Sequence, residues 1–195
     1  MFGPFSSSLW PGLALWLALY TSDLALTLKC AKLYRAQEQI RFAIGYELTP
    51  YYQKQIEQLK VVSFRFIYAL ASSSALLAVV WFASNGRVRE MGLYLFCLGA
   101  FILPELAVHL RHVRNYYLFK HALKSGLISG SISYAASVTY KSSALELLSF
   151  AALYLVLFAV VPSAFFLGGV VSCLSASVKH YTLARKATAR EQQHA

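Results

Sequence analysis

The residues best suited to chemistry lie on one face of an apolar segment near the middle of the chain. Glu105, His109 and His112 are spaced i, i+4 and i+7, which places them on one side of a helix. Asp23 and Thr27 show the same i, i+4 spacing in an apolar segment near the N-terminus. A carboxylate beside an imidazole can relay protons or bind a divalent metal, so both segments are candidates for a functional site.

Four ionisable residues in four apolar segments lie at a similar depth. Asp23, Arg65, Glu105 and Glu146 are each five or six residues from the basic residue that ends their segment. In a helix this spacing corresponds to a depth of about 7 to 9 Å. An ionisable group costs at least about 2.5 kcal/mol at the centre of a bilayer, so such residues usually face the interior of a helix bundle and meet partners.

This polar layer predicts a metal site if the four helices turn these faces toward one another. The ligands would be Asp23, Glu105, His109 and Glu146, a mixed oxygen and nitrogen set that suits a divalent metal such as zinc or iron. No other cofactor is indicated by the sequence.

The alternative interpretation is a set of ion pairs or a proton path through Asp23, Arg65, Glu105 and His112. A third group of residues, Arg111, Arg114 and Lys120, follows the same apolar segment and is typical of a basic collar that binds anionic lipids. His112 would also fit such a collar, which leaves its role open between the two interpretations.

The composition sets the class of protein in which these residues act. Of 195 residues, 58% are hydrophobic and 13% are charged, whereas typical soluble domains have about 25% charged residues. The net charge of +10 is distributed in clusters between apolar stretches, which is typical of a multi-pass membrane protein and not of a nucleic-acid-binding protein. The lipid bilayer is therefore the first partner that we expect.

The apolar stretches predict an all-α membrane protein, a polytopic bundle of transmembrane helices. We expect five spans, at about 9–28, 61–84, 91–110, 145–161 and 164–183. The last two would form one long tilted span if the chain did not fold back near Pro162 and Ser163, which would give four spans.

The positive-inside rule favours five spans over four. With five spans the basic residues divide as 16 against 2 between the two sides, and with four spans they divide as 12 against 6. The five-span arrangement places the N-terminus outside and the C-terminus inside a cytoplasmic (inner or plasma) membrane.

Two connections on the cytoplasmic side have structure-forming patterns of their own. In the segment 30–60, apolar residues at helical spacing predict that the first helix continues to about Ile44 and stops at Gly45. Thr49 and Pro50 then predict a second helix that leads directly into the next span, giving a cytoplasmic helical hairpin. The segment 126–140 alternates apolar and polar residues, which predicts a short β-hairpin.

Three functions remain open at this point. The polar layer favours a small cation, proton or metal channel or carrier, which we expect to be a homo-oligomer or part of a membrane protein complex. The cytoplasmic hairpin would suit a non-catalytic subunit or assembly factor of a membrane complex. A metal-dependent enzyme at the cytoplasmic leaflet is the third, although the sequence has no P-loop, no G-x-S-x-G and no H-E-x-x-H motif, so an enzyme is not favoured.

Overall fold

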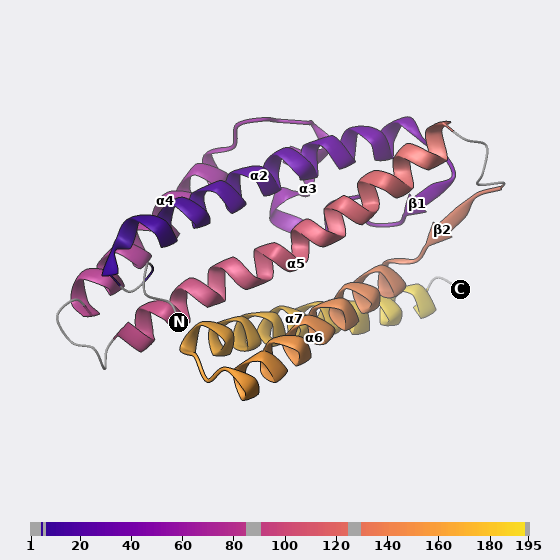
Figure 1. Cartoon of the computed structure of the whole chain (residues 1–195). Coiled ribbons are helices and arrows are strands. Elements are labelled where there is room, and N and C mark those ends of the chain that lie inside the picture. The colour runs from indigo at the N-terminus through magenta and orange to yellow at the C-terminus, as the bar shows by residue number, and fades with distance from the viewer. Residues whose placement is uncertain (1–4, 6, 85–90, 125–129, 194–195) are drawn as a thin grey trace. The chain divides into compact units, whose positions relative to one another are not determined.

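The computed structural model describes residues 5, 7–84, 91–124 and 130–193 (Figure 1). Within these residues the regular structure is almost entirely helical. The helices are α2 (Leu9–Ala36), α3 (Pro50–Glu57), α4 (Phe64–Ser84), α5 (Met91–Lys124), α6 (Ala136–Val160) and α7 (Ala164–Gln193). Two strands of three residues each, β1 (Ile40–Phe42) and β2 (Ile132–Tyr134), complete the list.

Four of the described helices, α2, α4, α5 and α6, are long and apolar enough to cross a membrane. In a bilayer a helix satisfies every backbone hydrogen bond within its own segment, which is why long apolar runs adopt this structure. The chain is therefore an all-α, multi-pass membrane protein, as the composition predicts. The less apolar α7 is not one of these four, so a fifth span stays a prediction.

The chain divides into two compact units. Unit 1 consists of Met1–Ser22, Val62–Ala107 and Leu147–Ser175, and unit 2 consists of Asp23–Val61, Val108–Glu146 and Ala176–Ala195. Helix α4 belongs to unit 1, whereas α3, β1 and β2 belong to unit 2. Helices α2, α5, α6 and α7 each contribute one segment to each unit.

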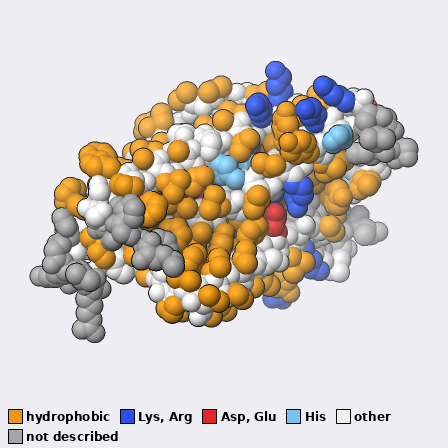
Figure 2. Space-filling model, viewed as in Figure 1, with side chains coloured by type: hydrophobic (Ala, Val, Ile, Leu, Met, Phe, Trp, Pro, Cys, Tyr) orange, Lys and Arg blue, Asp and Glu red, His pale blue; other side chains and the backbone are white. Residues whose placement is uncertain are grey.

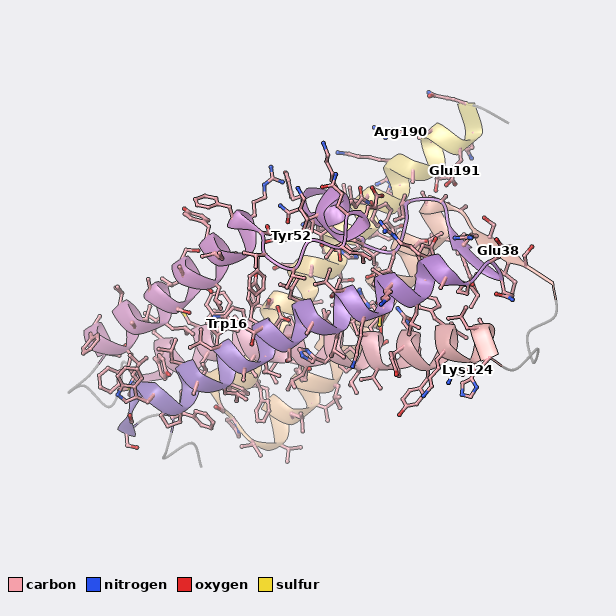
Figure 3. The ribbon with its side chains drawn as sticks, turned by 90° about the horizontal axis from the view of Figure 1, so that it is seen from above. Trp16, Glu38, Tyr52, Lys124, Arg190 and Glu191 are labelled. Carbon is pink, nitrogen blue, oxygen red and sulfur yellow. The ribbon has the colours of Figure 1, made fainter. Side chains whose placement is uncertain are left out.

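The core of unit 1 is built from large apolar side chains of α2, α4 and α5. Its fully or nearly fully buried members are Leu9, Trp16, Leu77, Tyr94, Leu98 and Ile102. The indole Nε1 of Trp16 donates a hydrogen bond to Ser73 Oγ at 3.0 Å, which satisfies its polar atom inside the core (Figure 3). This bond fixes α2 against α4 within the unit.

Helices α5 and α7 approach very closely in unit 1 because glycines face the contact. A Cβ atom on Gly168 would overlap the backbone oxygen of Phe96 and lie 2.8 Å from the backbone nitrogen of Ala100. A Cβ on Gly99 would lie 2.9 Å from Phe165 Cα. The absence of a side chain at these positions lets the two backbones touch, as small residues do in other membrane helix pairs.

The core of unit 2 is aromatic and includes the short sheet. Tyr34 and Phe119 are buried together, and Phe42 packs against them. Strand β1 pairs in parallel with β2, so that Ile40 lies opposite Ile132 (Figure 1).

A glutamate of α7 caps the N-terminus of α6 in the same unit. Glu191, labelled in Figure 3, accepts hydrogen bonds from the backbone N–H of Ser137 at 3.1 Å and from its hydroxyl at 2.6 Å. These bonds lower the pKa of the Glu191 carboxyl, and the carboxylate satisfies a donor that the first turn of a helix leaves open.

The segment 30–60 does not form the expected helical hairpin, because its first helix ends earlier than predicted. Helix α2 ends at Ala36, and the next residue, Gln37, is almost completely buried. Its side chain accepts a hydrogen bond from the Ile40 backbone N–H at 2.8 Å and donates one to the Ile40 carbonyl at 2.7 Å. These bonds replace the next helical turn, and the apolar residues beyond it enter the sheet instead.

The second helix of the expected hairpin is also shorter than predicted. Helix α3 begins at Pro50 with Thr49 at the N-cap position, as the sequence predicts, but it ends at Glu57. Leu59 then has a φ of 51°, which a helix does not allow, so the chain breaks before α4 begins at Phe64.

The expected β-hairpin at 126–140 is likewise replaced by other structure. Residues 126–129 lie outside the described residues, β2 pairs with β1 of a distant segment, and Ala136 already begins α6. The helices also extend beyond the predicted spans, since α5 continues from 110 to Lys124. Between α6 and α7 the helix is interrupted at residues 161–163, which include Pro162 and Ser163.

Gly45 supports the turn after β1 through its backbone conformation. Its φ is +80°, and its N–H donates to the Phe42 carbonyl at 3.0 Å. We expect Gly45→Ala to lower the free energy of unfolding by about 1 kcal/mol, because an L side chain is strained at positive φ. Chemical unfolding in detergent would measure this. Gly45→Asn should cost less, since asparagine tolerates this conformation, and equal losses for both variants would contradict the explanation.

Candidate functional site

His112 is the centre of a buried polar network in unit 2. Its Nε2 atom lies 2.9 Å from Thr27 Oγ1 and 3.3 Å from Asp23 Oδ1. Its Nδ1 atom lies 2.6 Å from the hydroxyl of Tyr46. Both ring nitrogens are therefore engaged, one toward α2 and the other toward the loop that follows β1.

The local sequence explains why these groups converge. Asp23 and Thr27 are one helical turn apart on α2 and present their side chains to the same neighbour. Tyr46 follows directly after Gly45, whose positive φ turns the chain back toward α5. Cys30, one further turn along α2, is completely buried and donates from its thiol to the His112 carbonyl at 3.3 Å.

The network accommodates His112 in either protonation state. When the imidazole is neutral with its proton on Nε2, the Tyr46 hydroxyl donates to Nδ1. When the imidazole is charged, Nδ1 donates to the Tyr46 oxygen and Nε2 donates to the Thr27 hydroxyl oxygen, with Asp23 Oδ1 3.3 Å from Nε2 as the counter-charge. A ring with an acceptor on each side can thus take up a proton on one nitrogen and release one from the other.

Asp23 lies beside a second histidine as well. An oxygen of Asp23 and a ring nitrogen of His109 lie within 4.8 Å of each other, a separation that one metal ion can bridge. Glu105 precedes His109 by one helical turn on α5, at the end of the α5 segment that belongs to unit 1. By its place on this helix, Glu105 is the next candidate ligand along the same stripe.

The structure gives Glu146 different neighbours from those expected for a metal ligand. Its carboxylate forms an ion pair with Arg111 Nε at 2.8 Å and lies 3.8 Å from a guanidinium nitrogen of Arg114. Arg111 is largely buried, with 13% of its side chain exposed, whereas 62% of the Arg114 side chain is exposed. Glu146 therefore neutralises the buried Arg111 of the predicted lipid collar.

The two remaining predicted residues lie in different units. Arg65 is exposed near the start of α4, in unit 1. Lys120 is half-buried on α5 in unit 2, where its Nζ lies 5.7 Å from the centre of the Tyr116 ring.

Two functional candidates in the loop after β1 were not found from the sequence. Burial raises the pKa of the Tyr46 hydroxyl well above its ordinary value, so Tyr46 stays protonated and acts through hydrogen bonds. Burial also raises the pKa of the Glu47 carboxyl, although a hydrogen bond from the Thr49 backbone N–H at 2.8 Å opposes this. Neither residue stands in a periodic pattern, so the sequence offers no signal for them.

No protein-family model matches this sequence, and comparisons with curated proteins and with solved structures also return no match. The function is therefore inferred from the residues of the site.

Proposed function

We propose that this protein is a small channel or carrier in which Asp23 and its two histidine neighbours bind a proton or a cation on its way through the membrane. The observation that carries this proposal is the position of Asp23. Its carboxylate lies on the apolar helix α2, 3.3 Å from His112 Nε2 and within 4.8 Å of a His109 nitrogen. Ionisable residues at such positions are expensive and commonly mark ion pathways.

The path for a proton in this proposal runs from the loop side of unit 2 to Asp23. His112 takes up a proton at Nδ1, where it then donates to the Tyr46 oxygen, and releases the proton on Nε2 toward the Asp23 carboxylate, while Tyr46 keeps its own proton. A return of the imidazole to its first tautomer resets the relay. A divalent cation would instead be held between Asp23 and His109, whose ligand atoms lie within 4.8 Å of each other.

The charge distribution supports an orientation for this path. Unit 2 contains 15 of the 18 Lys and Arg residues and six of the eight acidic residues, so its formal charge is +9 against +1 for unit 1. Figure 2 shows that hydrophobic side chains cover most of the face in view, and that Lys and Arg side chains stand at several separate places on it. We therefore place unit 2 at the cytoplasmic side.

The position of the C-terminal segment supports five crossings in the same proposal. The first part of α7 belongs to unit 1, and its second part, which carries Lys179, Arg185, Lys186 and Arg190, belongs to unit 2. If unit 2 lies at the cytoplasmic side, the basic second part of α7 lies there as well, which corresponds to five crossings with the N-terminus outside and the C-terminus inside.

Flux measurements in proteoliposomes test the proposed function. With a pH-sensitive dye and a zinc-sensitive dye inside the vesicles, we expect Asp23→Asn to reduce the active flux by roughly tenfold or more, because the amide can neither ionise nor accept the proton. Asp23→Glu should retain part of the flux. Glu38→Gln, which removes an exposed carboxylate of unit 2, is the matched control and should leave the flux unchanged.

If the Asp23→Asn variant kept the flux of the wild type, the transport role of this site would be refuted. The transport role would also be refuted if vesicles with monodisperse wild-type protein moved neither protons nor zinc above the level of protein-free vesicles. The proton-specific and zinc-specific dyes distinguish the two proposed cargoes.

A further inference from the structure

Two lysines from different helices of unit 2 converge on one tyrosine ring. Lys29 on α2 has its Nζ 6.0 Å from the centre of the Tyr116 ring, and Lys120 on α5 has its Nζ 5.7 Å from the same centre. Tyr116 and Lys120 are one helical turn apart, which places both on one side of α5. The aromatic ring attracts each ammonium group, so both lysines are drawn to the same side chain.

The surroundings of this lysine pair differ from those of the two arginines nearby on α5. Among the residues that the structure describes, no carboxylate forms an ion pair with Lys29 or Lys120, whereas Arg111 and Arg114 both face Glu146. Unit 2 as a whole carries a formal charge of +9. Two ammonium groups at one ring, with no ion pair to a carboxylate of the described residues, attract an anion from outside.

An exposed apolar stripe leads along α5 to this lysine pair. Leu110, Val113 and Tyr117 are spaced i, i+3 and i+7, and their exposed fractions are 58%, 43% and 56%. Lys120 stands at the next position of the same stripe, i+10 from Leu110. The helix rises about 15 Å over the ten steps from Leu110 to Lys120.

We infer that Lys29, Tyr116 and Lys120 bind the phosphate of an anionic phospholipid headgroup, while an acyl chain of the same lipid lies along the Leu110, Val113 and Tyr117 stripe. The apolar stripe ending in positive charge matches a molecule with an apolar tail and a negative head, which a free phosphate ion does not have. The inference does not depend on the proposed transport function, since it uses none of the residues around Asp23.

Native mass spectrometry of the full chain in mild detergent tests this site. The probes are phosphatidylglycerol, phosphatidylcholine with the same acyl chains, and inorganic phosphate. We expect the wild type to retain phosphatidylglycerol in preference to phosphatidylcholine. The double variant Lys29→Gln with Lys120→Gln should weaken phosphatidylglycerol binding by roughly tenfold or more, because each lysine near an anionic headgroup contributes substantially.

A matched control separates this site from the general positive charge of the unit. Lys54→Gln with Lys186→Gln also removes two charges from exposed lysines of unit 2, and we expect it to leave phosphatidylglycerol retention nearly unchanged. Tyr116→Leu keeps both charges but removes the ring that holds them, so it should weaken binding by roughly threefold.

Four outcomes would overturn the inference. These are equal retention of the two lipids by the wild type, unchanged binding by the Lys29 and Lys120 variant, an equal loss in the control variant, and full displacement of phosphatidylglycerol by millimolar inorganic phosphate. The last outcome would assign the lysine pair to a simple anion instead of a lipid.

Discussion

Gly168→Ala is expected to lower the free energy of unfolding by about 3 kcal/mol or more, even though alanine forms helices better than glycine by about 1 kcal/mol. A Cβ at Gly168 would meet the backbone of Phe96 and Ala100 on α5, and backbone atoms cannot move aside as a flexible side chain can. The two helices of unit 1 must separate to admit one methyl group. Thermal and chemical unfolding in detergent would measure the loss.

Two other glycines provide graded controls for this prediction. The three atoms nearest to a Cβ at Gly169 all belong to the Leu103 side chain, and its end can change rotamer although its own Cβ, at 2.9 Å, cannot. Gly169→Ala should therefore cost less than Gly168→Ala, where backbone atoms are met. A Cβ at Gly92 would meet only Ala164 Cβ at 4.0 Å, so Gly92→Ala should be neutral or slightly stabilising. If the three variants were equally stable, close backbone packing would not be what these glycines provide.

His112→Ala is expected to lower the free energy of unfolding by about 3 to 5 kcal/mol. The substitution removes the partner of three polar groups at once, namely the Asp23 carboxylate, the Thr27 hydroxyl and the Tyr46 hydroxyl. Only 9% of the His112 side chain and 24% of the Asp23 side chain are exposed, so water replaces the lost bonds poorly. The same unfolding measurement in detergent reports this loss.

A double-mutant cycle distinguishes the network from simple loss of packing. If the main cost is the carboxylate left without its imidazole, Asp23→Asn should make His112→Ala less damaging, with a coupling of about 1 kcal/mol or more. Lys124→Ala, at an exposed position of the same helix, is the control and should change stability by no more than about 0.5 kcal/mol. Additive effects of Asp23→Asn and His112→Ala would show that the two side chains do not act together.

Part of the site could be predicted from the spacing of residues on α2 and α5. The spacing of Asp23 with Thr27, and of His109 with His112, places each pair on one helical face without any knowledge of the fold. The equal depths of the charged residues also identified the level at which a site was expected. Depth, however, does not give the rotation of each helix about its axis.

That rotation decides the partner of each charged residue. Glu146 has the same predicted depth as Asp23, yet it faces Arg111, while Asp23 faces His112. Tyr46 completes the network from a loop, and its position depends on the turn at Gly45 and on the pairing of β1 with β2, which joins segments about 90 residues apart. Periodicity within a segment carries no information about such distant contacts.

The sequence was sufficient to predict a helical membrane protein, because apolar runs of this length must satisfy their backbone hydrogen bonds within each segment. The tertiary structure decided where α2 ends, through the bonds of Gln37 to Ile40, and which groups surround His112. The physical reason is that local spacing fixes the face of a helix on which a side chain lies, whereas packing between segments fixes what that face meets.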